Sequence, residues 1–221
     1  MNEVFSAAER AALYRVIESR RDVRAFRSDP IDAETLGRIL GAAHHAPSVG
    51  LMQPWNFIVI GDAATKSRVK GLFQAQNAVA VANYKGDRAD LYASLKLEGI
   101  EEAPLNLCVT CDRTRSGPHV LGRNTVVDTD LYSTCCAIQN LWLAARVEGV
   151  GVGWVSILDY DDLRPILGIP ATVVPVAYLC IGYPRKFLDE PELQRRGWAT
   201  RLPLEQIVFQ ERWGAPADES R

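Results

Sequence analysis

The chain of 221 residues has few of the side chains that build metal centres and disulfide frameworks. It contains three histidines, and no carboxylates stand at metal-ligand spacing around them, so we expect no bound metal. The odd number of cysteines, five, argues against a framework of disulfides. Four of them lie in apolar segments, where we expect them to be buried as small apolar side chains: Cys108, Cys111, Cys135 and Cys136.

The sequence also lacks a basic excess, long apolar runs and several known catalytic motifs, and each absence argues against a class of protein. The formal net charge is -2, whereas a general nucleic-acid binder usually carries a basic excess. No run of about 18 apolar residues is present, so we expect no membrane-spanning helix. Residues 1–10 have no apolar core of the signal-peptide type, and we therefore expect a cytoplasmic location. Neither a nucleophile elbow nor a Walker loop occurs, so nothing argues for hydrolysis.

What the chain does contain is an arginine stretch, Arg20-Arg21-Asp22-Val23-Arg24, in which three guanidinium groups surround one carboxylate. The planar fork of arginine matches two phosphate oxygens and keeps its charge, so the stretch suggests an anionic ligand. The alternative is an ordinary charged helix end at the surface. The helix dipole would favour Arg20 and Arg21 at such an end, but it does not explain Arg24.

Hydrophobic periodicity predicts helices that alternate with strands. A capping box at Ser6 and Glu9 predicts the start of the first helix near residue 7, and Asp32 can cap a second helix. This alternation indicates one α/β or α+β domain over residues 1–221, built around a small sheet. The remaining helices are expected at 63–102 with an interruption near 83–86, at 131–148 and at 159–167, and the strands at 57–60, 105–111, 149–157 and 173–181.

Three further segments are candidates for function. The interrupted helical segment predicts two helices with a mobile link, which makes residues 75–100 a candidate lid. The tail, 184–221, has little periodicity, as expected for an extension that wraps a partner subunit. The strand at 149–157 is rich in glycine, which allows a backbone or a ligand to approach closely. It is not a dinucleotide fingerprint, because the spacing differs and no helix follows at once.

These stretches resemble the 5,6-dimethylbenzimidazole synthase (BluB) family, a branch of the FMN-dependent nitroreductase-like fold. The arginine stretch alone would indicate only the wider superfamily. Asp22 within it, together with Gly153-Trp154-Val155-Ser156, points to the BluB branch. The resemblance extends over residues 8–214 and is carried by residues 20–24, 46–57, 94–100, 108–115, 130–134 and 151–157.

The resemblance implies an α+β fold with a small central sheet flanked by helices, in an intertwined homodimer with two FMN sites at the interface. It also implies an unusual reaction. Reduced FMN is consumed with O2 and fragmented to 5,6-dimethylbenzimidazole, the lower ligand of vitamin B12. An external NAD(P)H-flavin reductase would supply the reduced FMN.

The resemblance also assigns residues to the site. Asp22 and Ser156 match the family's catalytic pair, with Asp22 as general acid or base and Ser156 as an orienting hydroxyl. A lid that excludes water would suit this chemistry. The expected FMN contacts are the phosphate ligands Arg20, Arg21, Arg24 and Arg201, the flavin-lining Ser48 and Met52, Lys96 from the lid, and Asp22, Val23, Gly153 and Ser156.

Two alternatives stay open at this point. An NAD(P)H-dependent nitroreductase or flavin reductase would use FMN as a bound cofactor and leave it intact. A non-catalytic flavin-binding protein would have no use for a catalytic carboxylate. For Asp22 the competing interpretation is a salt bridge that merely holds the arginines in place.

Overall fold

The computed structural model describes residues 4–215. Its contacts divide the chain into two compact units, Met1–Asp189 and Glu190–Arg221. The second unit contains the short helix α7 (Glu192–Arg195) and the 3-10 turn η2 (Leu204–Gln206). All other elements belong to the first unit. The expectation of one domain with an extension from residue 184 stays a prediction.

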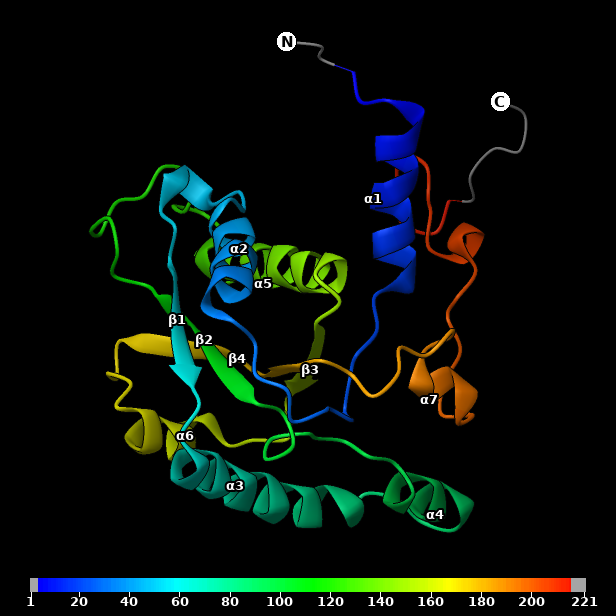
Figure 1. Cartoon of the computed structure of the whole chain (residues 1–221). Helices are drawn as coiled ribbons and strands as arrows, with labels where there is room; N and C mark the ends of the chain where they lie inside the picture. The colour runs from blue at the N-terminus through cyan, green and yellow to red at the C-terminus, as the bar shows by residue number, and fades with distance from the viewer. Residues whose placement is uncertain (1–3, 216–221) are drawn as a thin grey trace. The chain divides into compact units, whose positions relative to one another are not determined.

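The first unit is built around a four-stranded sheet in the order β1-β2-β4-β3, and every neighbouring pair is antiparallel (Figure 1). A bulge interrupts the β2–β4 pairing at Val109 and Thr110. The order leaves β3 at one edge of the sheet, where its outer backbone groups can pair with another segment. The strands are β1 (Trp55–Ile60), β2 (Leu105–Asp112), β3 (Gly151–Val155) and β4 (Val173–Gly182).

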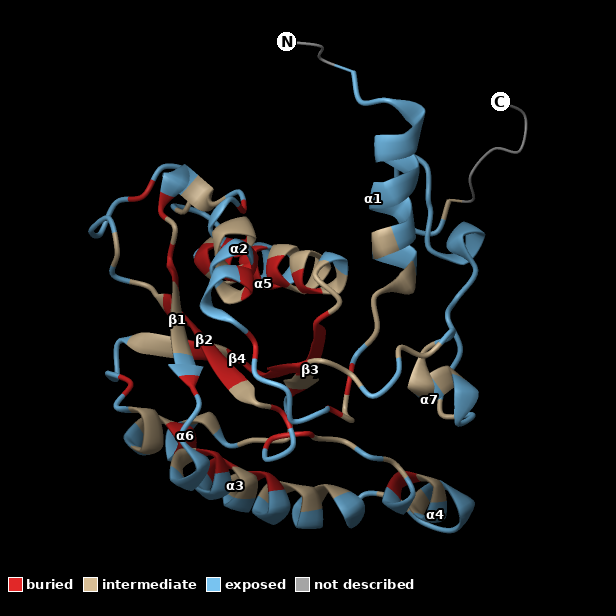
Figure 2. Cartoon of the chain, in the orientation of Figure 1, coloured by how far each residue is buried: buried red, intermediate tan, exposed pale blue. Residues whose placement is uncertain are grey.

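Helices cover both faces of this sheet (Figure 1). Helices α2 (Ala33–His44) and α5 (Thr129–Val147) lie on one face, and α3 (Ala63–Val81) and α6 (Tyr160–Leu167) lie on the other. Successive side chains of a strand point to opposite faces, so each strand contributes to both cores. Figure 2 shows the buried residues concentrated on the sheet and on the helix surfaces that face it. In β4, Leu179 packs beneath α2 and α5, and Tyr178 packs on the opposite side.

The helix α1 (Ala7–Ser19) has no buried residue, in contrast to helices α2, α3, α5 and α6. Its predicted capping box is confirmed: the Ser6 hydroxyl accepts from the Glu9 backbone N–H, and the Glu9 carboxylate accepts from the Ser6 backbone N–H. Leu13 and Ile17 remain 54% and 44% exposed. The apolar side of α1 is therefore largely uncovered by the described part of the chain.

The predicted interruption of the long helical segment is confirmed. Helix α3 ends at Val81, and α4 (Asp87–Ala93) begins after Gly86, whose φ of 54° belongs to the left-handed region that favours glycine. The Tyr84 and Tyr92 rings stack with centroids 4.8 Å apart across the break. Two helices are thus present, and the motion of this segment as a lid stays a prediction.

One expectation about cysteines is wrong. Cys108 and Cys111 lie buried in β2 as expected, but Cys135 and Cys136 are exposed on α5. Periodicity marked α5 as apolar on several sides, and in residues 4–215 no other element covers the side that carries these two thiols. No helix within those residues has the length and apolar character needed to cross a membrane.

Candidate active site

The arginine stretch follows the end of α1 and lies along the free edge of β3. Asp22 forms a parallel bridge with Val152, and the Val23 backbone N–H donates to the Val152 carbonyl oxygen at 2.9 Å. The Val23 side chain is buried in the core between the sheet and helices α3 and α6. Backbone pairing and a buried anchor therefore fix Asp22 and its neighbours at this edge of the sheet.

The glycines of β3 make this close approach sterically feasible. A Cβ atom at Gly153 would lie 2.0 Å from the Val23 carbonyl oxygen and 2.6 Å from Nη1 of Arg24. One at Gly151 would lie 2.8 Å from the Val23 side chain. From the sequence we expected either a backbone or a ligand to approach these glycines. In the structure residues 22–24 of the chain itself lie against them.

The Asp22 carboxylate is held by hydrogen bonds from Arg24 and from the backbone of Trp154. Its Oδ1 accepts from the Trp154 backbone N–H at 3.0 Å and from Nη1 of Arg24 at 2.7 Å. Its Oδ2 pairs with Nη2 of Arg24, which also donates to the Trp154 carbonyl oxygen at 2.8 Å. The Arg24 side chain is only 13% exposed, whereas that of Asp22 is 44% exposed. The carboxylate is therefore fixed in direction and still accessible from solvent.

The surroundings of Asp22 raise the pKa of its carboxyl group. Desolvation by the neighbouring protein atoms is the largest cause, and it outweighs the opposing effects of Arg24, the Trp154 N–H and Arg20. A carboxylate surrounded by solvent and paired with one arginine would show the opposite direction, so the protein atoms around Asp22 outweigh its partial exposure. A raised pKa brings the group closer to neutral pH, where a carboxyl can both release and accept protons, as a general acid or base requires.

The other two arginines have different partners. The Arg20 guanidinium lies over the Trp142 ring, 4.8 Å from its centroid. Arg21 donates from Nη1 to the Glu18 and Arg20 carbonyl oxygens, at 2.6 and 2.8 Å, and from Nη2 to that of Asp189. Its Nε is buried and has no acceptor among the described residues. The three guanidinium groups thus lie near one another along the chain, but Arg21 and Arg24 donate to different acceptors.

Two residues of α5 that sequence reasoning missed hold the start of the arginine stretch. The Trp142 indole N–H donates to the Arg21 carbonyl oxygen, and Nε of Arg146 donates to that of Ser19, both at 3.2 Å. Carbonyl groups at a helix C-terminus lack partners within the helix, so Arg146 completes the end of α1, and Trp142 holds the chain two residues further on. A tryptophan and an arginine four residues apart share one helix face, and this spacing was the available signal.

Ser156 follows β3 directly and is exposed. It lies two residues beyond Trp154, whose peptide groups hold Asp22. Both residues of the predicted catalytic pair therefore belong to the same end of β3. Sequence alone could not show this, because residues 22 and 156 are far apart in the chain.

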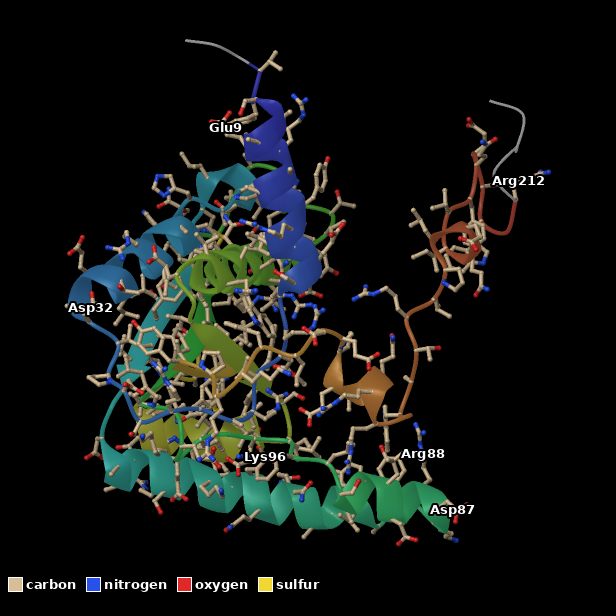
Figure 3. The ribbon with its side chains drawn as sticks, turned by 45° about the vertical axis from the view of Figure 1, so that its right-hand side comes forward. Glu9, Asp32, Asp87, Arg88, Lys96 and Arg212 are labelled. Atoms are coloured by element: carbon tan, nitrogen blue, oxygen red, sulfur yellow. The ribbon has the colours of Figure 1, made fainter. Side chains whose placement is uncertain are left out.

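The remaining predicted site residues have local partners. The Ser48 hydroxyl accepts from the Gln53 N–H at 3.0 Å, and Met52 is only 1% exposed. Lys96, in the segment that follows α4, forms an ion pair with Glu102 (Figure 3). Arg201 is exposed and belongs to the second unit. The structure thus places residues 22–24 beside Gly153 at the edge of β3, with Ser156 just beyond the end of that strand. The roles of all the predicted site residues stay predictions.

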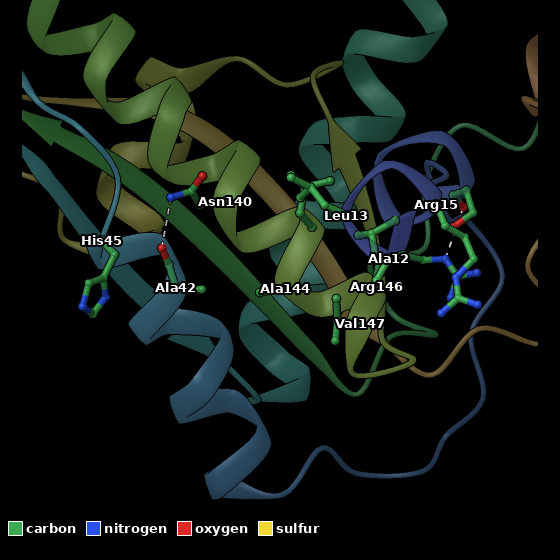
Figure 4. Close-up of a pocket in the computed structure, with 12 residues that line it drawn as sticks. Ala12, Leu13, Arg15, Ala42, His45, Asn140, Ala144, Arg146 and Val147 are labelled. Atoms are coloured by element: carbon green, nitrogen blue, oxygen red, sulfur yellow. Dashed lines mark hydrogen bonds between the residues drawn. The ribbon is translucent and has the colours of Figure 1, made fainter. Parts of the chain in front are cut away.

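A separate apolar groove of about 810 Å³ lies between α1, α2 and α5 (Figure 4). Hydrogen bonds join residues of its lining: the Asn140 amide donates to the Ala42 carbonyl oxygen and Nε of Arg146 donates to that of Ser19, both at 3.2 Å. Its lining is mainly aliphatic, with Arg15, Arg146 and His45 at the margins. The apolar residues that line it are Ala12, Leu13, Val16, Ala42, Leu143, Ala144 and Val147.

Comparison with known proteins agrees with this fold. The model of the nitroreductase family matches residues 17–183. A BluB-like flavoprotein structure from Clostridium difficile 630 superposes with a TM-score of 0.68 at 21% identity, covering 89% of this chain and 97% of the other. An iodotyrosine deiodinase structure, with FMN and 3-iodo-L-tyrosine bound, gives 0.67 at 23% identity, with 80% and 91% covered. The chain belongs to the nitroreductase family.

Relatives of higher identity narrow this membership to the 5,6-dimethylbenzimidazole synthase branch. The synthase of Rhodospirillum rubrum is 48% identical over 90% of this chain and 95% of its own length. A synthase of Rhodobacter capsulatus is 43% identical, with 91% and 97% covered. An NADH dehydrogenase of Thermus thermophilus is more distant, at 28% identity with 86% and 91% covered. The resemblance inferred from the motifs is thereby confirmed.

Proposed function

We propose that this protein is an enzyme that makes 5,6-dimethylbenzimidazole, the lower ligand of vitamin B12, by fragmenting reduced FMN with O2. The synthase relatives at 40–48% identity support the product and the place in cobalamin synthesis. The observation that carries the chemistry is Asp22, a carboxylate with a raised pKa that the Trp154 peptide and Arg24 fix beside an arginine stretch. A flavin reductase that recycles its cofactor has no need of such a group.

The residues at this site fit the phosphate end of FMN. The Nε of Arg21 is a buried donor without an acceptor in the described chain. Leaving such a group unsatisfied costs about 1–3 kcal/mol, more for a charged one. A phosphate oxygen would supply the missing acceptor, and Arg20 on the same stretch would add its charge. Arg201 of the second unit remains a further candidate ligand.

Bound reduced flavin would supply the electrons and the carbon skeleton of the product. The chain's own contribution is proton transfer and positioning. Asp22 takes up or releases a proton, and the exposed Ser156 hydroxyl orients the reacting end of the substrate. The segment that carries Lys96 closes over the site and excludes water. The remaining contacts proposed for the flavin are Val23, Ser48, Met52 and Gly153.

The same proposal includes a homodimer. None of the α1 residues is buried: Leu13 is exposed and lines the groove between α1, α2 and α5, and Ile17, one turn further along α1, is exposed as well. The exposed Cys135 and Cys136 extend this uncovered surface along α5. A second copy of the chain would bury these apolar groups and remove them from water. Sedimentation of the purified protein measures the assembly, and a monomer at micromolar concentration would contradict this part of the proposal.

Product formation tests the function directly. The purified protein is mixed with FMN, a separate flavin reductase, NADPH and air, and the products are analysed by mass spectrometry. We expect 5,6-dimethylbenzimidazole to appear as FMN disappears, and we expect neither change under nitrogen. If the protein itself oxidises NADPH and all FMN survives, the nitroreductase alternative holds instead. The external reductase is then not a required partner.

Replacement of Asp22 by Asn separates an enzyme from a protein that only binds flavin. Asn keeps the size of the side chain and removes the titrating proton. We expect the variant to retain FMN binding and to lose product formation by at least about two orders of magnitude, the usual contribution of general acid–base catalysis. A variant that fragments FMN at the parent rate would show that Asp22 is not the catalytic group.

A further inference from the structure

The geometry of Arg24 separates it from the other two arginines of the stretch. Its guanidinium meets both oxygens of the Asp22 carboxylate, in the bidentate arrangement that fixes the plane of a carboxylate. Both hydrogens of Nη2 are used, one by Asp22 Oδ2 and one by the Trp154 carbonyl oxygen. Nη1 lies against Gly153, where a Cβ would be only 2.6 Å away. Little of this side chain is left for a ligand, since it is 13% exposed.

Arg21 shows the opposite situation. Its Nη atoms bind backbone carbonyl oxygens, and its Nε is buried with no acceptor among the described residues. The two side chains are three residues apart on the same stretch. Arg21 therefore has a donor without an acceptor among the described residues, whereas Arg24 is already paired with the Asp22 carboxylate.

We propose that Arg24 is a positioning residue for Asp22, in place of the phosphate contact expected from the sequence. It fixes the direction of the carboxylate at the end of β3 and helps to keep it ionised. This inference rests on the proposed function in one respect, the catalytic role of Asp22. The arrangement itself depends on the described contacts of Arg24, Asp22, Gly153 and Trp154.

The charge environment of Asp22 gives the sign of the expected effect. Arg24 and Arg20 both lower the pKa of the carboxyl, against the larger raising effect of desolvation. The Cys180 thiol of β4 interacts electrostatically with the pair of Asp22 and Arg24 and with Glu98. Since the burial raises the pKa of Cys180 to about 12, this thiol is neutral and contributes no charge near neutral pH. Removing the Arg24 cation must therefore raise the pKa of Asp22 further.

The test uses Arg24→Gln, with Arg24→Lys as a second variant that keeps the charge in case the Gln variant folds poorly. Affinities for FMN and for riboflavin, which lacks the phosphate, are measured by flavin fluorescence on the purified protein. If Arg24 serves Asp22, Arg24→Gln changes both affinities alike, and their ratio stays within about twofold. A lost charged hydrogen bond to phosphate would instead weaken FMN selectively, by roughly tenfold to a hundredfold.

The second measurement is the titration of Asp22 by carboxyl NMR, which needs no turnover. We expect a higher midpoint in Arg24→Gln and a smaller rise in Arg24→Lys, and the pH profile of product formation should move the same way. Arg21→Gln is the matched control: it should weaken the binding of FMN more than the binding of riboflavin. Selective loss of FMN affinity in Arg24→Gln, or an unchanged Asp22 midpoint, would overturn the inference. An unchanged ratio in Arg21→Gln would count against the proposed phosphate site and not against the role of Arg24.

Discussion

A methyl group added at Gly153 should detach the arginine stretch from the sheet. In Gly153→Ala the new Cβ would lie 2.0 Å from the Val23 carbonyl oxygen, far inside van der Waals contact. Both groups belong to backbones that are held by hydrogen bonds, so neither can rotate away as a side chain would. We therefore expect residues 22–24 to move away from the edge of β3.

The size of the effect follows from the contacts that such a movement breaks. The bond from the Val23 N–H to Val152 is neutral and is worth about 0.5–1.5 kcal/mol, while that from the Trp154 N–H to Asp22 involves a charge and is worth about 1.5–3 kcal/mol. Overpacking of a filled site alone typically costs about 1–3 kcal/mol. We expect the free energy of unfolding to fall by about 2–4 kcal/mol.

Urea unfolding followed by tryptophan fluorescence measures this loss, at one fixed protein concentration because the stability of the proposed dimer would depend on it. Gly37→Ala is the control: Gly37 lies in α2, and nothing lies within 4 Å of its added Cβ. Helix propensity predicts a gain of up to about 1 kcal/mol for that control. If Gly153→Ala matches the parent within about 0.5 kcal/mol and binds FMN equally well, the close packing of Gly153 against Val23 does not determine the site.

Three other changes have expected outcomes. Asp130→Asn should lower the free energy of unfolding in urea by about 3 kcal/mol, because the fully buried Asp130 carboxylate neutralises Arg113 and Arg123. Asp128, which also pairs with Arg113, is half-exposed, and Asp128→Asn should lower it by less than about 1 kcal/mol. Burial raises the pKa of the Cys108 thiol to about 12, so iodoacetamide at pH 8 should label it only after unfolding, as mass spectrometry can verify. Folding raises the pKa of the Asp22 carboxyl, so the parent loses stability as pH rises from the ordinary pKa of an aspartate toward the raised one, and Asp22→Asn does not. The variant leaves Arg24 without its carboxylate, and its deficit in Tm against the parent should therefore shrink between acid and neutral pH in parallel thermal melts.

The elements themselves were predictable, because their signals are local. Ser6 and Asp32 cap helices that begin at the next residue, as expected from their side-chain oxygens. The strand predicted at 105–111 ends one residue later, and the helix predicted at 131–148 occupies 129–147. Each of these depends on the spacing of apolar and capping residues within a few turns of chain.

The pairing of distant segments could not be predicted in the same way. No residue near Asp22 in the sequence indicates that Val152 is its bridge partner. The strand order β1-β2-β4-β3 depends on how all four strands contribute side chains to the two cores. The glycines of β3 indicated that something approaches closely, but a missing Cβ does not reveal what fills its place. The two support residues on α5, Trp142 and Arg146, looked like ordinary members of an apolar helix.

The arginine stretch shows most clearly what a count of charges leaves out. In sequence Arg20, Arg21 and Arg24 are equivalent guanidinium groups, and an anionic ligand is the simplest reason for three of them. In the fold each meets a different acceptor: an indole ring, the carbonyl groups at the end of α1, and the Asp22 carboxylate. Net positive charge would still attract a phosphate to this edge of the sheet. What distinguishes the three is the surface that each one packs against: α5 for Arg20, the end of α1 and Asp189 for Arg21, and β3 for Arg24. Of these surfaces, α5, Asp189 and β3 lie far away in the chain.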